Sequence, residues 1–293
     1  MRRRFYCIAL LLGSALFAKG ANGACDRECL RGFVTQYLNA LAVHKPSDLS
    51  VTGNVRFTED TVEQKLGESQ LWRNASALRP YRLDILDVRA GVAASQTIVE
   101  ESGMPVMLML RLKISGGKIA EVETQVTRNK TEGSLFKPEA LKAASGAMLW
   151  VPPDAERNSR EEATKIAELY PAGLKAGSFV TVNTPFAPDA YRFENGSLMA
   201  GPGCTFMPGC EDIKAQKIPT LSGIQYRVAA VDEYLGIVLL RMDFGAGSSR
   251  VAGDSLDVWE AFKVYGGQIH AVEAFMKNMP LGTPSGWDSA GAK

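Results

Sequence analysis

The sequence has few of the residues that build metal, nucleotide or hydrolase sites. Its 293 residues include two histidines, His44 and His270, and five scattered cysteines, so a dedicated zinc site is disfavoured. Two histidines so placed do not complete a Ser-His-Asp triad. The glycine-rich stretch at 245–249 lacks the lysine that follows in a phosphate-binding loop. We therefore expect no metal, no cofactor and no serine hydrolase chemistry.

A strong charge of one sign is also absent. The chain has 33 basic and 32 acidic residues, and four of the basic ones lie in the first 24 positions, where there is no acid. The rest of the chain is weakly acidic and has no basic run, so nucleic acid is not an expected partner. The contents of 46% hydrophobic and 22% charged residues are those of a folded globular protein.

The apolar run near the N-terminus is short. It covers positions 7–18, about 12 residues, whereas a membrane-spanning helix needs roughly 20. Three arginines at 2–4 precede it, and small residues follow, including Ala-Asn-Gly at 21–23 as a cleavage motif. This arrangement predicts a signal peptide over residues 1–24, a secreted or periplasmic protein, and no membrane span.

Four cysteines remain once Cys7 is removed with the predicted signal peptide: Cys25, Cys29, Cys204 and Cys210. An even number in an exported protein indicates disulfides, and the spacing pairs them locally as Cys25–Cys29 and Cys204–Cys210. The first bridge would flank a candidate helix N-cap, Asp26, and the second would close a loop that contains Pro and Gly. The alternative, a metal site of four free thiols, does not suit these spacings.

The strongest internal signal is a repeat. Residues 112–124 and 262–274 share the pattern apolar-Lys-apolar-x-Gly-Gly-x-Ile-x-x-Val-Glu. In each copy the Gly-Gly pair separates two strand-like runs, which predicts a hairpin whose turn residues have positive φ. Each half also begins with a helical pattern. Apolar residues recur at helical spacing over 30–41, and a capping box at Ser159 and Glu162 begins a second helix that we expect to end at Pro171.

A proline pair at 152–153 separates the two halves. We predict domain one at residues 25–152, domain two at residues 153–281 and a flexible tail at residues 282–293. Each domain is expected to contain one helical segment, an irregular stretch and about four strands joined by tight turns.

Several motifs resemble those of a family of exported proteins. They are Cys-x3-Cys-Leu-x2-Phe-Val-x2-Tyr-Leu from position 25, Val-Arg-Phe-Thr-Glu at 55–59, Ala-Tyr-Arg-Phe-Glu-Asn-Gly at 190–196, the cysteine pair of the second half and Tyr-Arg-Val at 226–228. Secreted fungal and bacterial proteins with a domain of unknown function carry similar motifs. The order of elements also resembles the cone-shaped α+β fold of nuclear transport factor two and its SnoaL-like relatives. The resemblance implies two tandem cone-shaped domains, each a helical segment plus a curved antiparallel sheet.

The same resemblance implies an assembly and a function. Single domains of this fold often pair through the open sheet face, so we expect the two domains to pack sheet against sheet in a mostly monomeric protein. Relatives include isomerases, dehydratases, cofactor-free lyases of aromatic, lignin-derived compounds, and non-catalytic binding domains. The leading hypothesis is a cofactor-independent lyase or isomerase that uses general acid/base chemistry on a small hydrophobic or aromatic molecule. The alternative is a non-catalytic small-molecule-binding or interaction protein.

Glu273 and Glu123 are the candidate catalytic residues. They occupy equivalent positions of the repeat, and strand alternation places Glu273 on one face with Ile269 and Phe275. If this face lines the cone, apolar neighbours would raise the pKa of the acid into the range that suits general acid/base catalysis. Otherwise both acids are solvated charges on an exposed face. Domain two is the favoured site, because Glu123 shares its face with a second acid, Glu121.

Candidate substrate-binding residues are two arginines and three aromatics. Arg56 and Arg192 stand at similar places after the helices, each followed closely by an acid. Each either forms a structural ion pair with that acid or holds a carboxylate or phenolate of the substrate. Tyr37, Trp72 and Tyr226 are aromatics of the kind that line such cones, and they are equally suitable as core residues. The loop between the cysteines of domain two is placed where it could shape a pocket rim.

Overall fold

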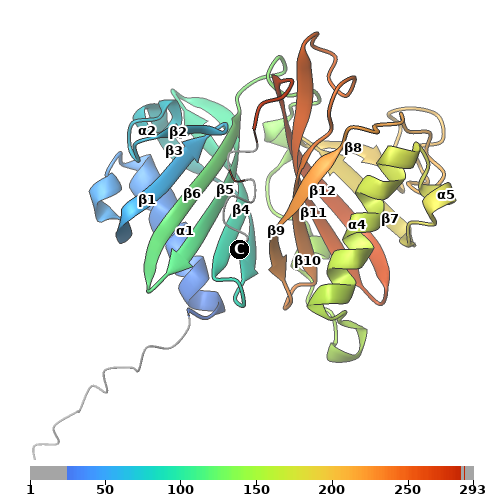
Figure 1. The fold of residues 1–293 in the computed structure, drawn as a ribbon, viewed down its shortest axis with the longest axis horizontal. Helices are drawn as coiled ribbons and strands as arrows, with labels where there is room; N and C mark the ends of the chain where they lie inside the picture. Colours follow the sequence, from blue (N-terminus) through green and yellow to red (C-terminus); the bar gives the residue numbers. More distant parts are fainter. Residues whose placement is uncertain (1–24, 285–286, 288–293) are drawn as a thin grey trace, which may run out of the picture.

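The computed structural model describes residues 25–284 and residue 287. The predicted signal peptide and most of the predicted tail lie outside the described residues. Within them the chain forms two similar α+β domains, each built around a six-stranded sheet (Figure 1). We call the N-terminal one domain one and the C-terminal one domain two; the limits given above for the two domains remain a prediction.

The two domains have the same order of strands and differ in the position of the second helix. Domain one contains α1 (Arg27–Ala42), η1 (Pro46–Asp48), β1 (Val51–Glu59), β2 (Val62–Gln64), α2 (Gln70–Asn74), β3 (Ala75–Asp87), β4 (Val92–Glu101), β5 (Met104–Ser115) and β6 (Lys118–Thr127). A connecting segment follows, with η2 (Pro138–Ala140), α3 (Gly146–Leu149) and η3 (Asp154–Glu156). Domain two contains α4 (Arg160–Ala176), α5 (Phe179–Val182), β7 (Phe186–Glu194), β8 (Ser197–Ala200), β9 (Gln225–Asp232), β10 (Ile237–Asp243), β11 (Asp254–Tyr265) and β12 (Gln268–Pro280).

Each sheet is mixed. The strand orders are β2-β1-β6-β5-β4-β3 and β8-β7-β12-β11-β10-β9. Neighbouring strands are antiparallel except for β1 with β6 and β7 with β12, which are parallel. The sheets are thus larger than the four or so strands expected and not purely antiparallel, because the first long strand after each helix lies beside the last strand of its domain.

The helices begin where the sequence predicts. Asp26 caps α1 by accepting a hydrogen bond from the backbone N of Cys29, and Ser159 with Glu162 forms the capping box of α4. The end of α4 differs from the prediction, since the helix runs through Pro171 to Ala176. Leu174, one turn beyond the proline, is buried, so packing holds this last turn against domain two.

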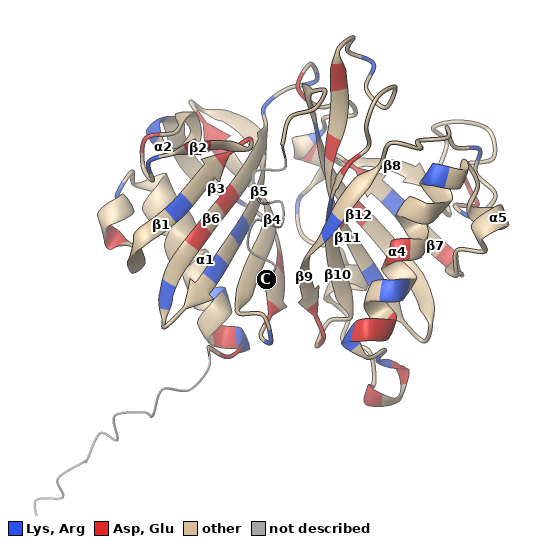
Figure 2. Ribbon diagram, in the orientation of Figure 1, with Lys and Arg blue, Asp and Glu red and all other residues tan. Residues whose placement is uncertain are grey.

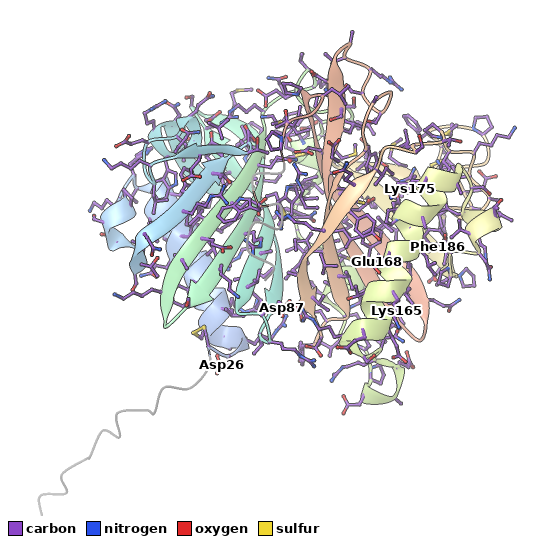
Figure 3. All side chains as sticks on the ribbon, viewed as in Figure 1. Asp26, Asp87, Lys165, Glu168, Lys175 and Phe186 are labelled. Atoms are coloured by element: carbon purple, nitrogen blue, oxygen red, sulfur yellow. A yellow bond between two sulfur atoms is a disulfide. The ribbon has the colours of Figure 1, made fainter. Side chains whose placement is uncertain are left out.

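The predicted turns and disulfides are present. Gly116-Gly117 and Gly266-Gly267 join β5 to β6 and β11 to β12, and all four residues have positive φ. Cys25 is bonded to Cys29 and Cys204 to Cys210. The first bridge lies beside Asp26 at the start of α1 (Figure 3).

The two sheets face each other in the middle of the molecule, with α1 and α4 on the outer sides (Figure 1). Each domain has its own apolar core between helix and sheet. A third apolar cluster lies between the sheets and includes Ile85 and Met109 of domain one with Leu239 and Trp259 of domain two. This is the sheet-to-sheet packing that the resemblance implies.

Polar contacts also join the domains. Asp87 of β3, at the boundary between the domains in Figure 3, accepts hydrogen bonds from Arg160 of α4 at 2.9 and 2.6 Å. It accepts another from the backbone N of Val231 in β9, at 2.8 Å. Elsewhere, basic and acidic residues are interspersed over both domains (Figure 2).

Candidate functional site

The cone of domain two encloses a cavity of about 580 Å³, which we call the domain-two cavity. Apolar side chains form most of its wall, among them Leu174, Met199, Leu221 and Phe244. Phe206 also lines it and belongs to the disulfide-closed loop, so this loop forms part of the rim, as the sequence predicts. A cavity of this size and character can hold a small organic molecule.

The buried end of the domain-two cavity is polar. Tyr170 of α4 and Arg192 of β7 line it and are 1% and 6% exposed. Arg192 donates hydrogen bonds to the Tyr170 hydroxyl (3.2 Å) and to Gln216 Oε1 (2.9 Å). Its Nε lies 2.8 Å from Glu194 Oε1. These contacts hold the guanidinium in place, with its positive charge next to the Tyr170 hydroxyl.

Glu260 of β11 lies beside this group. Its side chain is 1% exposed, and its Oε2 is buried with no hydrogen-bond partner among the described residues. Burial raises the pKa of Glu260 to about 8; the nearby Glu194 carboxylate adds to this, whereas Arg192 and a hydrogen bond with Tyr170 oppose it. A carboxyl group with this pKa changes its protonation state near neutral pH, as general acid/base catalysis requires.

Glu260 and Tyr170 are functional candidates that the sequence analysis missed. Glu260 stands between Val258 and Phe262, which belong to the apolar core of domain two. Glu260 could therefore have been identified from the sequence as an acid on an apolar strand face. Tyr170 follows the helical apolar period of α4, and by itself that pattern indicates only a core residue.

The register of the sheets corrects the matching of Arg56 with Arg192. Arg192 pairs with Val272 of β12, whereas it is Phe57 that pairs with the equivalent Val122 of β6. Phe57 is therefore the counterpart of Arg192. Arg56 is shifted by one residue along its strand, which turns its side chain to the opposite face of the sheet.

Arg56 lies at the surface of domain one. It forms an ion pair with Glu63 at 2.9 Å, and the expected partner, Glu59, is bound instead by Arg128 at 3.0 Å. The Arg56 guanidinium also lies 4.1 Å from a ring centre of Trp287, a residue of the predicted tail. Arg192, by contrast, is paired with the acid expected for it.

Apolar core residues of domain one stand at the positions of the polar cavity residues of domain two. Through the repeat, Leu110 occupies the position of Glu260, and Phe57 that of Arg192. Trp72 and Tyr37 are buried, with Trp72 Nε1 donating to the Tyr37 hydroxyl at 3.0 Å and the rings edge to face at 5.4 Å. Tyr37 and Trp72 are therefore core residues, and the buried arginine and acid distinguish domain two.

Glu123 and Glu273 lie between the two sheets and do not line a cone. A β-bulge at His270 reverses the alternation in β12, so Ile269 belongs to the core of domain two. Ala271, next to the bulge, belongs to the cluster between the sheets, on the side of Glu273. The face that carries the two acids is thus the one buried against the other domain.

Glu273 connects three parts of the chain. It accepts hydrogen bonds from Ser145 of the connecting segment (2.8 Å), Tyr191 of β7 (2.8 Å) and Tyr81 of β3 (3.4 Å). Burial raises the pKa of Glu273, and these three hydrogen bonds oppose the shift. Its contacts with protein groups make it a polar link between the domains.

Glu123 has a similar place on domain one. It forms an ion pair with Arg227 of β9 and lies 3.8 Å from Arg111 of β5. Burial raises the pKa of Glu123, and both arginines oppose the shift. The Glu123–Arg227 pair crosses the domain boundary and is 5% and 21% exposed at its two side chains.

Tyr226 is 39% exposed and lies outside the domain-two cavity. With Arg227, Arg241 and Trp287 it lines a second cavity, of about 920 Å³, between the ends of β9 and β10 and the C-terminal segment. Both arginines are already paired there, with Glu123 and Asp257 respectively.

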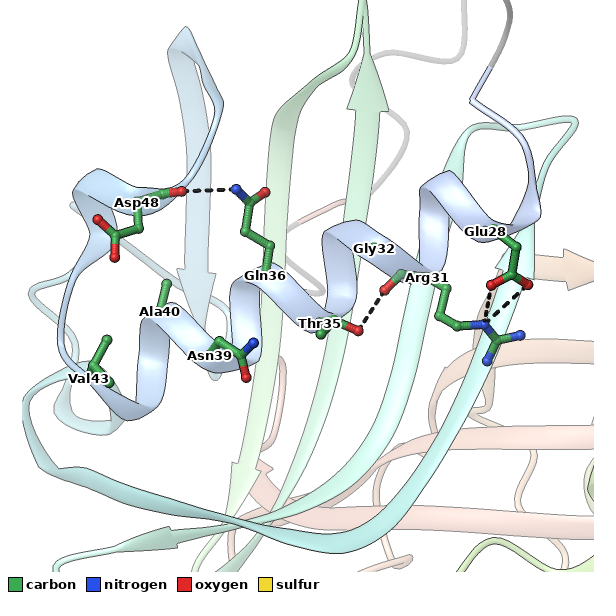
Figure 4. A pocket seen from close by; sticks show the side chains of 9 residues that line it. All are labelled: Glu28, Arg31, Gly32, Thr35, Gln36, Asn39, Ala40, Val43 and Asp48. Atoms are coloured by element: carbon green, nitrogen blue, oxygen red, sulfur yellow. Dashed lines mark hydrogen bonds and ion pairs between the residues drawn. The ribbon is translucent and has the colours of Figure 1, made fainter.

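A shallow hollow of about 690 Å³ follows the outer side of α1 (Figure 4). Three polar side chains along it donate hydrogen bonds to nearby groups: Arg31 to Glu28, Thr35 to the Arg31 carbonyl and Gln36 to the Asp48 carbonyl. These local contacts stabilise the helix and give the hollow no buried polar end of the kind found in domain two.

Comparison with known proteins finds a family match over part of the chain. Residues 156–276 match a family model described as "Domain of unknown function (DUF8021)". The structure is similar to a de novo designed protein with a curved β-sheet (20% identity over 35% of this chain and 88% of that one, TM-score 0.30). It is also similar to an NTF2-like protein of unknown function from Cytophaga hutchinsonii (10% identity over 35% and 91%, TM-score 0.27). No curated protein matches the chain.

None of the helices in the described residues has the length and apolarity that a membrane span requires. No group of His, Cys, Asp and Glu side chains in this part of the chain is arranged to hold a metal ion.

Proposed function

We propose that the protein is an exported, cofactor-independent lyase or isomerase that acts on a small hydrophobic or aromatic molecule bound in the domain-two cavity. The observation that carries this proposal is Glu260. A buried carboxyl group whose pKa is about 8 lies next to a tyrosine that lines an apolar cavity. In this proposal the acid/base group is Glu260, on the helix side of the sheet in domain two, rather than Glu273 or Glu123.

The geometry suggests a proton relay. Ionised Glu260 takes the hydroxyl proton of Tyr170 while the Tyr170 oxygen takes a proton from the carbon next to a carbonyl group of the ligand. The electron pair of the broken C–H bond passes into the resulting enolate, and the Arg192 guanidinium stabilises the negative charge. Return of the proton to another carbon completes an isomerisation. Loss of an oxygen substituent that takes the proton with it completes an elimination.

Hydrogen exchange into the ligand tests this proposal without requiring net conversion. The purified protein is incubated in D₂O with a panel of aryl β-hydroxyketones and enones, and deuterium at the carbon next to the carbonyl group is followed by NMR. E260Q and Y170F are expected to lower the exchange rate by about 100-fold or more, the usual size of a general acid/base contribution. For the unaltered protein, kcat/KM is expected to rise with pH and to level off above about 8, the pKa of Glu260, and E260Q should lose this dependence.

E273Q is the matched comparison, because Glu273 is also a buried acid but lies between the sheets, in contact with Tyr81 of domain one. It should retain exchange activity. If E273Q abolished exchange and E260Q retained it, the site would be at the domain boundary.

The alternative is a non-catalytic binding protein, and one observation favours it: Glu260 lies behind Tyr170 and Arg192 and is not itself part of the cavity wall. Saturable ligand binding without any deuterium incorporation over the whole panel would establish this alternative.

A further inference from the structure

Two basic residues stand at the open end of the domain-two cavity. Lys130, from the segment after β6, and Arg250, from the loop between β10 and β11, both line the cavity and are exposed. The opposite end, at Tyr170 and Arg192, is buried. The cavity therefore has a cationic mouth, an apolar middle and a polar inner end.

One side chain brings the two basic segments together. Asn278 of β12 donates a hydrogen bond from Nδ2 to the carbonyl of Thr131, which is next to Lys130, at 2.9 Å. Its Oδ1 accepts one from the hydroxyl of Ser249, which is next to Arg250, also at 2.9 Å. The neighbours of both cations are thus bound to the same side chain, so Lys130 and Arg250 belong to one edge of the mouth.

Among the described residues, Lys130 and Arg250 have no acidic partner. Within residues 25–284 and residue 287, no ion pair is made by Lys130 or Arg250. The acid nearest in sequence to Lys130, Glu132, is engaged by Lys277 at 3.1 Å. At the inner end, in contrast, Arg192 is paired with Glu194. The unbalanced charge of the cavity is therefore positive and lies at its mouth.

We infer that the ligand of the domain-two cavity is a monocarboxylate with an apolar body. The body fills the apolar middle, and the carboxylate lies between Lys130 and Arg250 at the mouth. This inference rests on the proposed function for the location of the site. A positively charged rim beside a low-dielectric wall attracts and orients an organic anion and leaves its neutral analogue without that contribution.

A pair of probes that differ in charge tests this. Binding of 4-phenylbutyrate and of the neutral 4-phenylbutan-1-ol is measured by calorimetry at low and high salt. The carboxylate is expected to bind more tightly at low salt and to lose this advantage at high salt, because exposed charges are screened. Equal affinities of the two probes at low salt would overturn the inference.

The K130Q/R250Q double variant tests the residues. It should bind 4-phenylbutyrate about tenfold more weakly, the combined size of two exposed ion pairs, and bind the alcohol unchanged. K45Q/K118Q, two exposed lysines of domain one, is the matched control and should behave as the unaltered protein. An unchanged affinity of K130Q/R250Q for the carboxylate contradicts the mouth assignment, while deuterium exchange that still depends on Glu260 leaves the proposed function standing. If exchange no longer depended on Glu260 while the carboxylate still bound more tightly than the alcohol, the proposed function would be refuted instead.

Discussion

The pH dependence of stability is a direct consequence of burying Glu260. Its pKa rises from the ordinary 4.5 to about 8 in the folded protein. The folded state therefore keeps a proton that the unfolded chain releases, and the free energy of unfolding falls as the pH rises from about 4.5 to 8. Between pH 5 and pH 7 this one group is expected to lower the stability by about 2.5 kcal/mol. Well below pH 4.5 both states are protonated and the effect is absent.

Substitution with glutamine isolates this contribution. Urea unfolding of the protein and of E260Q at pH 5, 6 and 7, followed by circular dichroism, gives the difference in free energy of unfolding at each pH. Other buried acids affect both proteins equally and cancel. E260Q should gain about 2.5 kcal/mol relative to the unaltered protein over this range, while E139Q, at an exposed position in η2, should show no such gain. A pH-independent difference between E260Q and the unaltered protein would refute the reasoning.

Two further predictions concern the domain boundary and the rim. E123A should lower the free energy of unfolding by about 3 kcal/mol, because it leaves Arg227 without its partner between the sheets; an unchanged urea midpoint would contradict this. Removal of the Cys204–Cys210 bridge by serine substitutions should cost about 2 kcal/mol and weaken 4-phenylbutyrate binding in calorimetry, since Phe206 loses its fixed position at the rim. Serine substitutions at the Cys25–Cys29 bridge should destabilise α1 without changing ligand affinity, and an equal loss of affinity in both variants would argue against a role of the rim.

Local sequence signals determined much of the fold. The Gly-Gly turns, the capping box of α4, the Asp26 cap and the two local disulfides depend on a few neighbouring residues, and each could be predicted from them. The end of α4 could not, because burial of Leu174 outweighs the effect of Pro171 on the helix. The parallel pairs β1–β6 and β7–β12 were also not predicted, because the two strands of each pair are far apart in the sequence and leave no local signature.

The site depends on registers that the sequence pattern did not resolve. A single-residue bulge at His270 puts Ile269 and Glu273 on opposite faces of the sheet. Arg56 is one residue away from the position equivalent to Arg192. Each moves a side chain to the opposite face of its sheet. The sequence analysis favoured domain two as the site because of Glu273. The structure favours the same domain for a different reason, namely that Arg192 and Glu260 are buried around the domain-two cavity.

Methionine methyl NMR tests the location of the site most directly. Met199 and Met276 line the domain-two cavity, whereas Met107 and Met109 belong to the clusters between the sheets. In protein labelled with ¹³C at the methionine methyl groups, saturation with 4-phenylbutyrate should shift the Met199 and Met276 signals and leave those of Met107 and Met109 in place. Shifts confined to Met107 and Met109 would place the ligand between the domains and contradict the account.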